Sequence, residues 1–140
     1  MHRNVPRLVA AAALLAAAGA CSSNPATTTT PTPPATQLTE TFSQTLTPNG
    51  AVIFPFNATS AGAVTASLST ISPDASLTLA IDLGTWNGTS CSIQFTTNPA
   101  TQGSGVGATA TAAGSLCTRV SDPHGVITSS EAIIITVTHF

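Results

Sequence analysis

The chain of 140 residues is short of charge. It has three basic residues, all arginine, and five acidic residues, so charged residues make up 6% of the sequence. So few cations cannot neutralise a phosphate backbone, which excludes nucleic acid as a partner, and they form no basic patch for anionic lipid headgroups. The same shortage argues against a protein partner that is recognised through charge.

Residues that ligate metals or carry out catalysis are also few and scattered. No Cys/His group has the spacing of a zinc site, and no two acids share a loop that would give calcium its six to eight oxygens. Ser121, Asp122 and His124 are the nearest approach to a catalytic set. Asp122-Pro123-His124-Gly125 is also typical of a turn, in which Asp accepts a backbone N–H and Gly takes a positive φ. We interpret it as a turn, and the sequence predicts no enzyme, no metal and no cofactor.

Helical periodicity is absent after residue 20. Apolar and polar residues alternate instead, and Pro, Asn, Asp and Gly interrupt this alternation at short intervals. This pattern predicts a single domain over residues 38–140, an antiparallel β-sandwich or jelly roll of about eight strands. The expected strands lie within residues 41–46, 52–56, 64–68, 77–83, 91–95, 106–112, 114–122 and 132–139. A longer polar loop is expected over residues 98–107.

Two of these expected strands carry a further indication of their place in a sheet. Pro55 cannot donate a backbone N–H, so its strand is expected at an edge. The run Ile133-Ile134-Ile135 in the last strand predicts burial on both faces or a covered edge.

The N-terminus has the features of an export signal. Arg3 and Arg7 precede an apolar run over residues 8–18, and small residues follow before Cys21. This predicts a secretory signal peptide over residues 1–20. A cysteine directly after small residues resembles the lipobox of bacterial lipoproteins, which implies cleavage before Cys21 and a membrane anchor through lipid on its thiol. The alternative is a secreted protein in which Cys21 is incidental.

The residues after Cys21 indicate a tether and a destination. Ser22 and Ser23, with no Asp, resemble the sorting signal of outer-membrane lipoproteins. Residues 22–37 contain four prolines and almost no apolar side chain, and such a segment cannot bury enough surface to fold. Residues 21–37 are therefore expected to be a lipid-anchored Pro/Thr-rich linker, with a reach of roughly 50 Å at about 3.1 Å per residue.

The two remaining cysteines are expected to form a disulfide. With Cys21 assigned to lipid, Cys91 and Cys117 are an even pair in an oxidising compartment. Their bridge would close a loop of about 27 residues, worth about 3.5 kcal/mol by the chain-entropy estimate; the alternative is two buried free thiols. Because Leu116 and Val120 share one face of the strand, Cys117 is expected to point outward. Its partner must then reach it from a neighbouring strand or the rim, unless a bulge turns Cys117 inward.

Two segments carry a family resemblance. Gly114-Ser115-Leu116-Cys117-Thr118-Arg119-Val120 and the closing strand resemble the late pattern of bacterial pre-peptidase C-terminal domains, a jelly-roll group that includes collagenase-type binding modules. Asp74-Ala75-Ser76-Leu77 resembles their middle strand. The resemblance implies the fold rather than an activity, because Leu116 replaces the family's aromatic residue and the acids that bind calcium in some members are missing.

Three residues are candidates for contact with a ligand. Trp86 and Asn87 lie on a tight connection, where an exposed indole would stack on a sugar ring; the alternative is a Trp that caps the end of the sandwich. Arg119 is the one cation left after residues 1–20 are removed. Arg119 has two alternative roles: it forms a surface ion pair with Glu131 or Asp122, or it contacts a carboxylate of a partner.

The sequence as a whole favours a non-enzymatic lipoprotein of the bacterial outer membrane. Its folded domain is expected to be a structural or protein-interaction module with an exposed apolar or β-edge patch. The alternative is a carbohydrate- or peptidoglycan-binding module that uses Trp86 and the loop over residues 98–105.

Overall fold

The computed structural model describes residues 33–140. The predicted signal peptide, Cys21 and most of the predicted linker lie outside the described residues. Residues 33–37 are exposed and have no regular secondary structure. Within residues 33–140, no helix is long and apolar enough to cross a membrane.

Eight strands account for most of the described chain, in agreement with the number predicted. They are β1 (Leu38–Leu46), β2 (Ala51–Ala58), β3 (Gly62–Ser72), β4 (Leu79–Trp86), β5 (Cys91–Ala100), β6 (Gly105–Ala110), β7 (Gly114–Ser121) and β8 (Glu131–His139).

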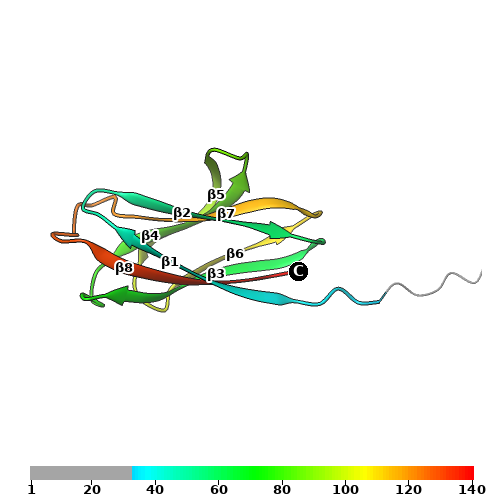
Figure 1. Cartoon of the computed structure of the whole chain (residues 1–140), viewed down its shortest axis with the longest axis horizontal. Helices are drawn as coiled ribbons and strands as arrows, with labels where there is room; N and C mark the ends of the chain where they lie inside the picture. The colour runs from blue at the N-terminus through cyan, green and yellow to red at the C-terminus, as the bar shows by residue number, and fades with distance from the viewer. Residues whose placement is uncertain (1–32) are drawn as a thin grey trace, which may run out of the picture. The chain divides into compact units, whose positions relative to one another are not determined.

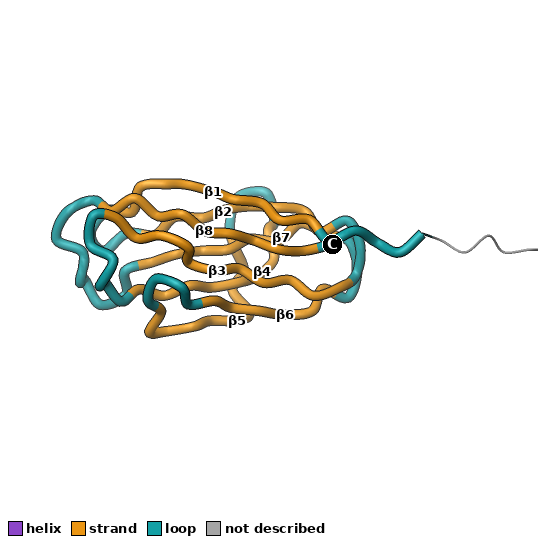
Figure 2. Tube along the Cα trace, turned by 90° about the horizontal axis from the view of Figure 1, so that it is seen from below, coloured by secondary structure: helices purple, strands orange, loops and turns teal. Residues whose placement is uncertain are grey.

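The strands form two antiparallel sheets that face each other. One sheet has the order β1-β8-β3-β6 and the other has the order β2-β7-β4-β5. Figure 1 shows the two layers packed one above the other, and Figure 2 looks onto the sandwich face-on, with β1, β8, β3 and β6 in succession across one sheet. Eight strands in two four-stranded sheets, linked mostly by crossovers between the sheets, form a jelly roll. The predicted fold class is confirmed.

The core lies between the two sheets and follows directly from the alternation in the sequence. Phe54 and Phe56 of β2 are buried on the inner face of one sheet, and Ile133, Ile135 and Val137 of β8 are buried on the inner face of the other. Each such side chain contributes roughly 1.5–3 kcal/mol by leaving water. The inner faces therefore hold the sandwich closed.

The two predictions about strand position have different outcomes. β2, which contains Pro55, is an edge strand as predicted. β8 lies in the middle of its sheet, so its isoleucine run is not a covered edge. Ile133 and Ile135 are fully buried in the core, and Ile134 on the outer face is partly buried.

The predicted polar loop over residues 98–107 is wrong. β5 continues to Ala100 and β6 begins at Gly105, so only a four-residue turn over residues 101–104 connects them. The turn pairs with β3, since Gly103 donates its N–H to the carbonyl of Leu68 at 2.7 Å and Ser104 accepts the N–H of Leu68 at 2.8 Å. Pro99 does not end the strand, because β5 lies at a sheet edge, where a missing N–H costs little.

Candidate functional site

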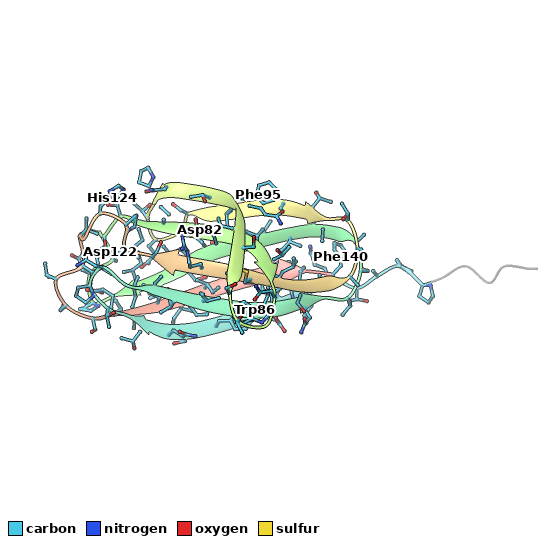
Figure 3. All side chains as sticks on the ribbon, turned by 90° about the horizontal axis from the view of Figure 1, so that it is seen from above. Asp82, Trp86, Phe95, Asp122, His124 and Phe140 are labelled. Carbon is cyan, nitrogen blue, oxygen red and sulfur yellow. A yellow bond between two sulfur atoms is a disulfide. The ribbon has the colours of Figure 1, made fainter. Side chains whose placement is uncertain are left out.

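The β4–β5 hairpin bends away from its own sheet. Leu83 pairs with Phe95 and Gly84 pairs with Ile93, so Gln94 is an extra residue in β5. A bulge of this kind bends the strand that contains it. In Figure 1 the hairpin rises above the upper sheet, and in Figure 3 it crosses the outer face of that sheet with Trp86 at its tip.

Gly84 permits the close approach that this bend requires. A Cβ atom at Gly84 would overlap with the carbonyl oxygen of Ser92 on the returning strand. Glycine is therefore required at position 84 for steric reasons. Its backbone angle is not the cause, since Gly84 is not among the glycines with positive φ. Only glycine fits at this position while β5 stays pressed against β4.

A disulfide holds the bent hairpin against the sheet. Cys91, the first residue of β5, is bonded to Cys117 of β7, and their Cα atoms are 5.8 Å apart. β4 lies between β5 and β7 in the sheet, so the bridge passes over it at Gly84, which pairs with Cys117. The predicted disulfide is confirmed. Cys117 points outward as expected, and β7 has no bulge in its pairing with β2 or β4.

The bend opens the side of the sandwich between β5 and β6, and we call this opening the wedge groove. It has a volume of about 390 Å³, and the core residues Val64 and Leu83 and the partly buried Leu116 are among those lining it. Phe95 of β5, 47% exposed, lies in its wall, and residues 110–114 also line it. No charged residue lines the groove.

β6 borders the wedge groove with a free backbone edge. Gly105 directs its carbonyl away from β3, where it accepts a hydrogen bond from the Thr97 hydroxyl at 2.9 Å. Antiparallel pairing alternates, so the backbone groups of Gly107 and Thr109 also point away from β3. No strand of the described chain pairs with this side of β6.

A second hollow lies beneath the hairpin tip, and we call it the tip cleft. It has a volume of about 540 Å³ and lies between the hairpin tip and strands β2 and β7. Its lining residues are Pro55, Phe56, Asn57, Trp86, Asn87, Gly88 and Ser115. None of these residues is charged.

The two candidates on the hairpin have different roles. Trp86 lines the tip cleft and keeps part of its surface accessible, and it lies over the face of the sheet instead of capping the end of the sandwich. Asn87 closes its own turn. Its Oδ1 accepts the N–H groups of Thr89 and Ser90 at 3.0 and 2.8 Å, and its Nδ2 donates to the Ser90 hydroxyl at 2.8 Å. The amide of Asn87 therefore serves the fold.

The site predicted from Trp86 and residues 98–105 is not assembled. Trp86 pairs with Cys91 at one end of the β4–β5 pair, and Leu79 pairs with Ala100 at the other end. The polar residues that line the tip cleft together with Trp86 from other strands are Asn57 of β2 and Ser115 of β7. Sequence reasoning missed both, because a polar residue on an outward strand position carries no local signal of what covers it.

Arg119 forms an ion pair, but with neither of the predicted partners. Its Nε and Nη2 both lie 2.8 Å from Oδ2 of Asp82, which is 1% exposed. The two residues are directly opposite each other in the β4–β7 register. Glu131 lies in the other sheet and accepts the N–H of Asp74 at 3.0 Å. The prediction of Glu131 or Asp122 as the partner of Arg119 is wrong, because strand order and not closeness in sequence decides the pairing.

Asp122 organises one end of the sandwich. Its carboxylate accepts the N–H groups of Asn49, Val126 and Ile127 at 3.1, 2.8 and 3.1 Å. Burial opposes ionisation, yet hydrogen bonds from these and one further backbone N–H hold the pKa of Asp122 below its usual range. His124 is exposed and Gly125 has φ of 64°, which confirms the predicted turn.

The remaining ionisable groups form no reactive cluster in the described part of the chain. Residues 33–140 contain no group of three or more His, Cys, Asp or Glu placed to hold a metal. His139 is buried, with Nε2 at 3.4 Å from Glu40 and its ring 5.2 Å from that of Phe56. The two hollows on either side of the hairpin are therefore the features with the character of a binding site.

Neither a family model nor a curated protein matches the sequence. The resemblance to pre-peptidase C-terminal domains therefore stays a prediction. Function is inferred from the geometry of the domain and from the N-terminal sequence.

Proposed function

We propose that this protein is a non-enzymatic interaction module of the bacterial cell envelope. Its N-terminus is cleaved before Cys21, and lipid on that residue anchors the chain in the outer membrane. Residues 22–37 hold the domain away from the bilayer. The signal-like N-terminus and the lipobox-like cysteine support this location, and so does the Cys91–Cys117 bridge, since structural disulfides persist in oxidising compartments.

The observation that carries the proposed activity is the wedge groove beside the free edge of β6. An unpaired sheet edge next to an apolar hollow is suited to the addition of a strand from another protein, in which backbone hydrogen bonds give affinity and side-chain pockets give specificity. Gly107 and Thr109 supply the outward backbone groups. Phe95 and the floor of the groove supply apolar surface for alternate side chains of the added strand.

The lining of the groove defines the partner. Because it contains no charged residue, a charged side chain entering it would lose its hydration without gaining a counter-ion. The small side chains of Ala108 and Ala110 leave room for a backbone to approach closely. The partner is therefore an extended, uncharged segment of an envelope protein, with small or aliphatic side chains on the face that enters the groove.

Proline substitution tests strand addition directly. Thr109→Pro removes one outward N–H from β6 and no hydrogen bond within the sheet, whereas Thr109→Ala removes only the side chain. With the lipidated chain as bait in envelope extract, we expect a partner that wild type and Thr109→Ala retain and that Thr109→Pro loses at least tenfold. Hydrogen exchange on the purified complex should show new protection of the Gly107 and Thr109 amides.

A second variant locates the apolar contact. Phe95→Ser is expected to weaken capture of the same partner several-fold while the melting temperature changes little, because Phe95 is already 47% exposed. Thermal unfolding of each variant checks that the fold is intact. The proposal would be contradicted if Thr109→Pro and Phe95→Ser both captured the partner as well as wild type does. It would also be contradicted if the bound partner protected no backbone amide of β6.

A further inference from the structure

We propose that the tip cleft is a second binding site, and that its ligand is a neutral sugar in the pyranose form. The cleft lies on the outer face of the β2-β7-β4-β5 sheet, while the wedge groove lies between β5 and β6. Its volume of about 540 Å³ is within the range of small-ligand sites, which is roughly 300–1,000 Å³. The site does not depend on the protein partner proposed above.

Trp86 supplies the stacking surface. A pyranose ring presents a face of C–H groups, and the indole of Trp is the largest flat apolar surface that a protein offers to such a face. Trp86 is the one tryptophan in the chain and is partly exposed inside the cleft. The Cys91–Cys117 bridge and the self-closed turn at Asn87 hold the hairpin that carries it. The stacking surface is thus positioned before a ligand arrives, which lowers the entropy cost of binding.

Asn57 and Ser115 supply polar groups opposite the indole. They are directly paired across β2 and β7, and the Ser115 hydroxyl donates to Oδ1 of Asn57 at 2.8 Å. The Nδ2 group of Asn57 has no hydrogen-bond partner within residues 33–140. If the side-chain amide of Asn57 were turned by 180°, so that its O and N changed places, one of these two atoms would still lack a hydrogen-bond partner within residues 33–140. Sugar hydroxyls donate and accept hydrogen bonds, and the amide and hydroxyl here match that capacity.

The absence of charge restricts the class of sugar. No residue lining the cleft is charged. On the same sheet, Asp82 and Arg119 form an ion pair in which each neutralises the charge of the other. A phosphate, a sulfate or a uronic acid would enter without a cation to meet it, so such ligands are disfavoured. Stacking plus amide and hydroxyl contacts, without charge, selects neutral hexoses and N-acetylhexosamines.

Fluorescence of the single tryptophan provides the test. Neutral oligosaccharides of glucose and of N-acetylglucosamine, titrated into the folded chain, should shift or quench the emission of Trp86 with saturation. An oligomer of galacturonic acid should bind at least tenfold more weakly. Binding of each sugar is then measured by saturation-transfer NMR, which does not need the indole.

Variants assign the binding to the tip cleft. Trp86→Ala should lower affinity by more than tenfold, with Trp86→Phe intermediate, and Asn57→Ala should lower it about tenfold. Thr96→Ala removes an exposed hydroxyl from β5 of the same hairpin, outside both hollows, and should bind as wild type does. Thr109→Pro should also leave sugar affinity unchanged, which separates failure of this site from failure of the wedge groove.

Three results would overturn the proposal: no saturable response to either neutral oligosaccharide up to its solubility limit, equal affinity for the galacturonic acid oligomer, or full affinity in both Trp86→Ala and Asn57→Ala. Should Trp86→Ala not fold, as judged by its melting temperature, Trp86→Phe and Asn57→Ala decide the question alone.

Discussion

At the scale of single residues, the buried polar side chains of this domain are almost all satisfied by specific partners. The Asp122 carboxylate binds backbone N–H groups, Asp82 binds Arg119, and Glu131 binds the N–H of Asp74. Thr118, fully buried in β7, is the exception, because its Oγ1 has no hydrogen-bond partner within the described residues. A buried hydroxyl without a partner costs stability.

Thr118→Val should therefore stabilise the protein. Valine keeps the β-branched shape and replaces the unpaired hydroxyl with a methyl group, for an expected gain of about 1 kcal/mol in the free energy of unfolding. Urea unfolding monitored by Trp86 fluorescence measures it. Thr138→Val, on the outer face of β8 where the hydroxyl lies 3.2 Å from that of Thr39, is the control and should show no gain. A destabilised Thr118→Val would show that the hydroxyl has a role that geometry does not reveal.

Asp122→Asn should destabilise the protein in a way that depends on pH. The folded-state pKa of Asp122 lies below that of the unfolded chain, so the carboxylate contributes stability above about pH 4 and loses it as pH falls through the folded-state pKa. We expect a loss of about 2 kcal/mol in the variant at pH 7, because one acceptor oxygen is replaced by an amide donor. The difference from wild type should shrink below pH 4. An equal difference at pH 7 and pH 3 would contradict this account.

At the scale of elements, the β4–β5 hairpin is the part of the sandwich that departs from regular geometry. Gln94 makes the bulge, Gly84 permits the close approach, and Cys91 fixes the position of the strand. The bend separates β5 from β6 and places Trp86 over β7 and β2. Both candidate binding sites therefore depend on one hairpin.

Gly84→Ala tests the bend. The added methyl group would overlap with the Ser92 carbonyl, and since that atom belongs to the backbone, the strand must shift. Overpacking of this kind costs about 1–3 kcal/mol. Gly114→Ala is the matched control, because a Cβ there meets no atom within 4 Å. Chemical denaturation of both variants should show a loss for Gly84→Ala alone, and equal stabilities would contradict the steric argument.

At the scale of the whole molecule, the stability of the domain over residues 33–140 rests on long-range contacts and on the Cys91–Cys117 cross-link. Leu38 at the start of the domain pairs with His139 at its end, so the two ends of the folded domain share a sheet. The disulfide closes a shorter loop between β5 and β7. Its removal should affect the unfolded state of the whole domain as well as the hairpin.

Replacing both cysteines with alanine should lower the free energy of unfolding by about 3.5 kcal/mol on the chain-entropy estimate. The red shift of Trp86 emission in the still-folded variant would report the release of the hairpin from the sheet. Calorimetry measures the first effect and fluorescence the second. A variant with wild-type emission would show that Gly84 and the strand pairing alone hold the hairpin down.

Much of the fold was predictable because strand periodicity is local. Val52, Phe54 and Phe56 alternate with polar residues, and this alternation alone assigns one face to the core. Pro55 predicted an edge strand because proline lacks a backbone N–H in any fold, so this constraint is visible in the sequence alone. The turn at Asp122 was predictable for the same reason, since Asp and Gly carry their turn preferences with them.

The sites were less predictable because they depend on residues far apart in the sequence. The sequence indicated Trp86 as a candidate but not Asn57 or Ser115, which line the tip cleft with it only because β2, β7 and β4 are neighbours. The partner of Arg119 was predicted wrongly for the same reason. The loop predicted at residues 98–107 was wrong because polar, Gly-containing sequence does not reveal that its first residues continue β5 beside β4 and its last residues pair with β3.

The sequence by itself determined the strand count, the inner and outer faces, and the cysteines available for a bridge. These follow from side-chain period, turn chemistry and composition, which act over a few residues. The tertiary structure alone decided the strand order, the bend of the hairpin and the two hollows beside it. Those depend on which strands become neighbours, and that is settled by packing of the whole domain.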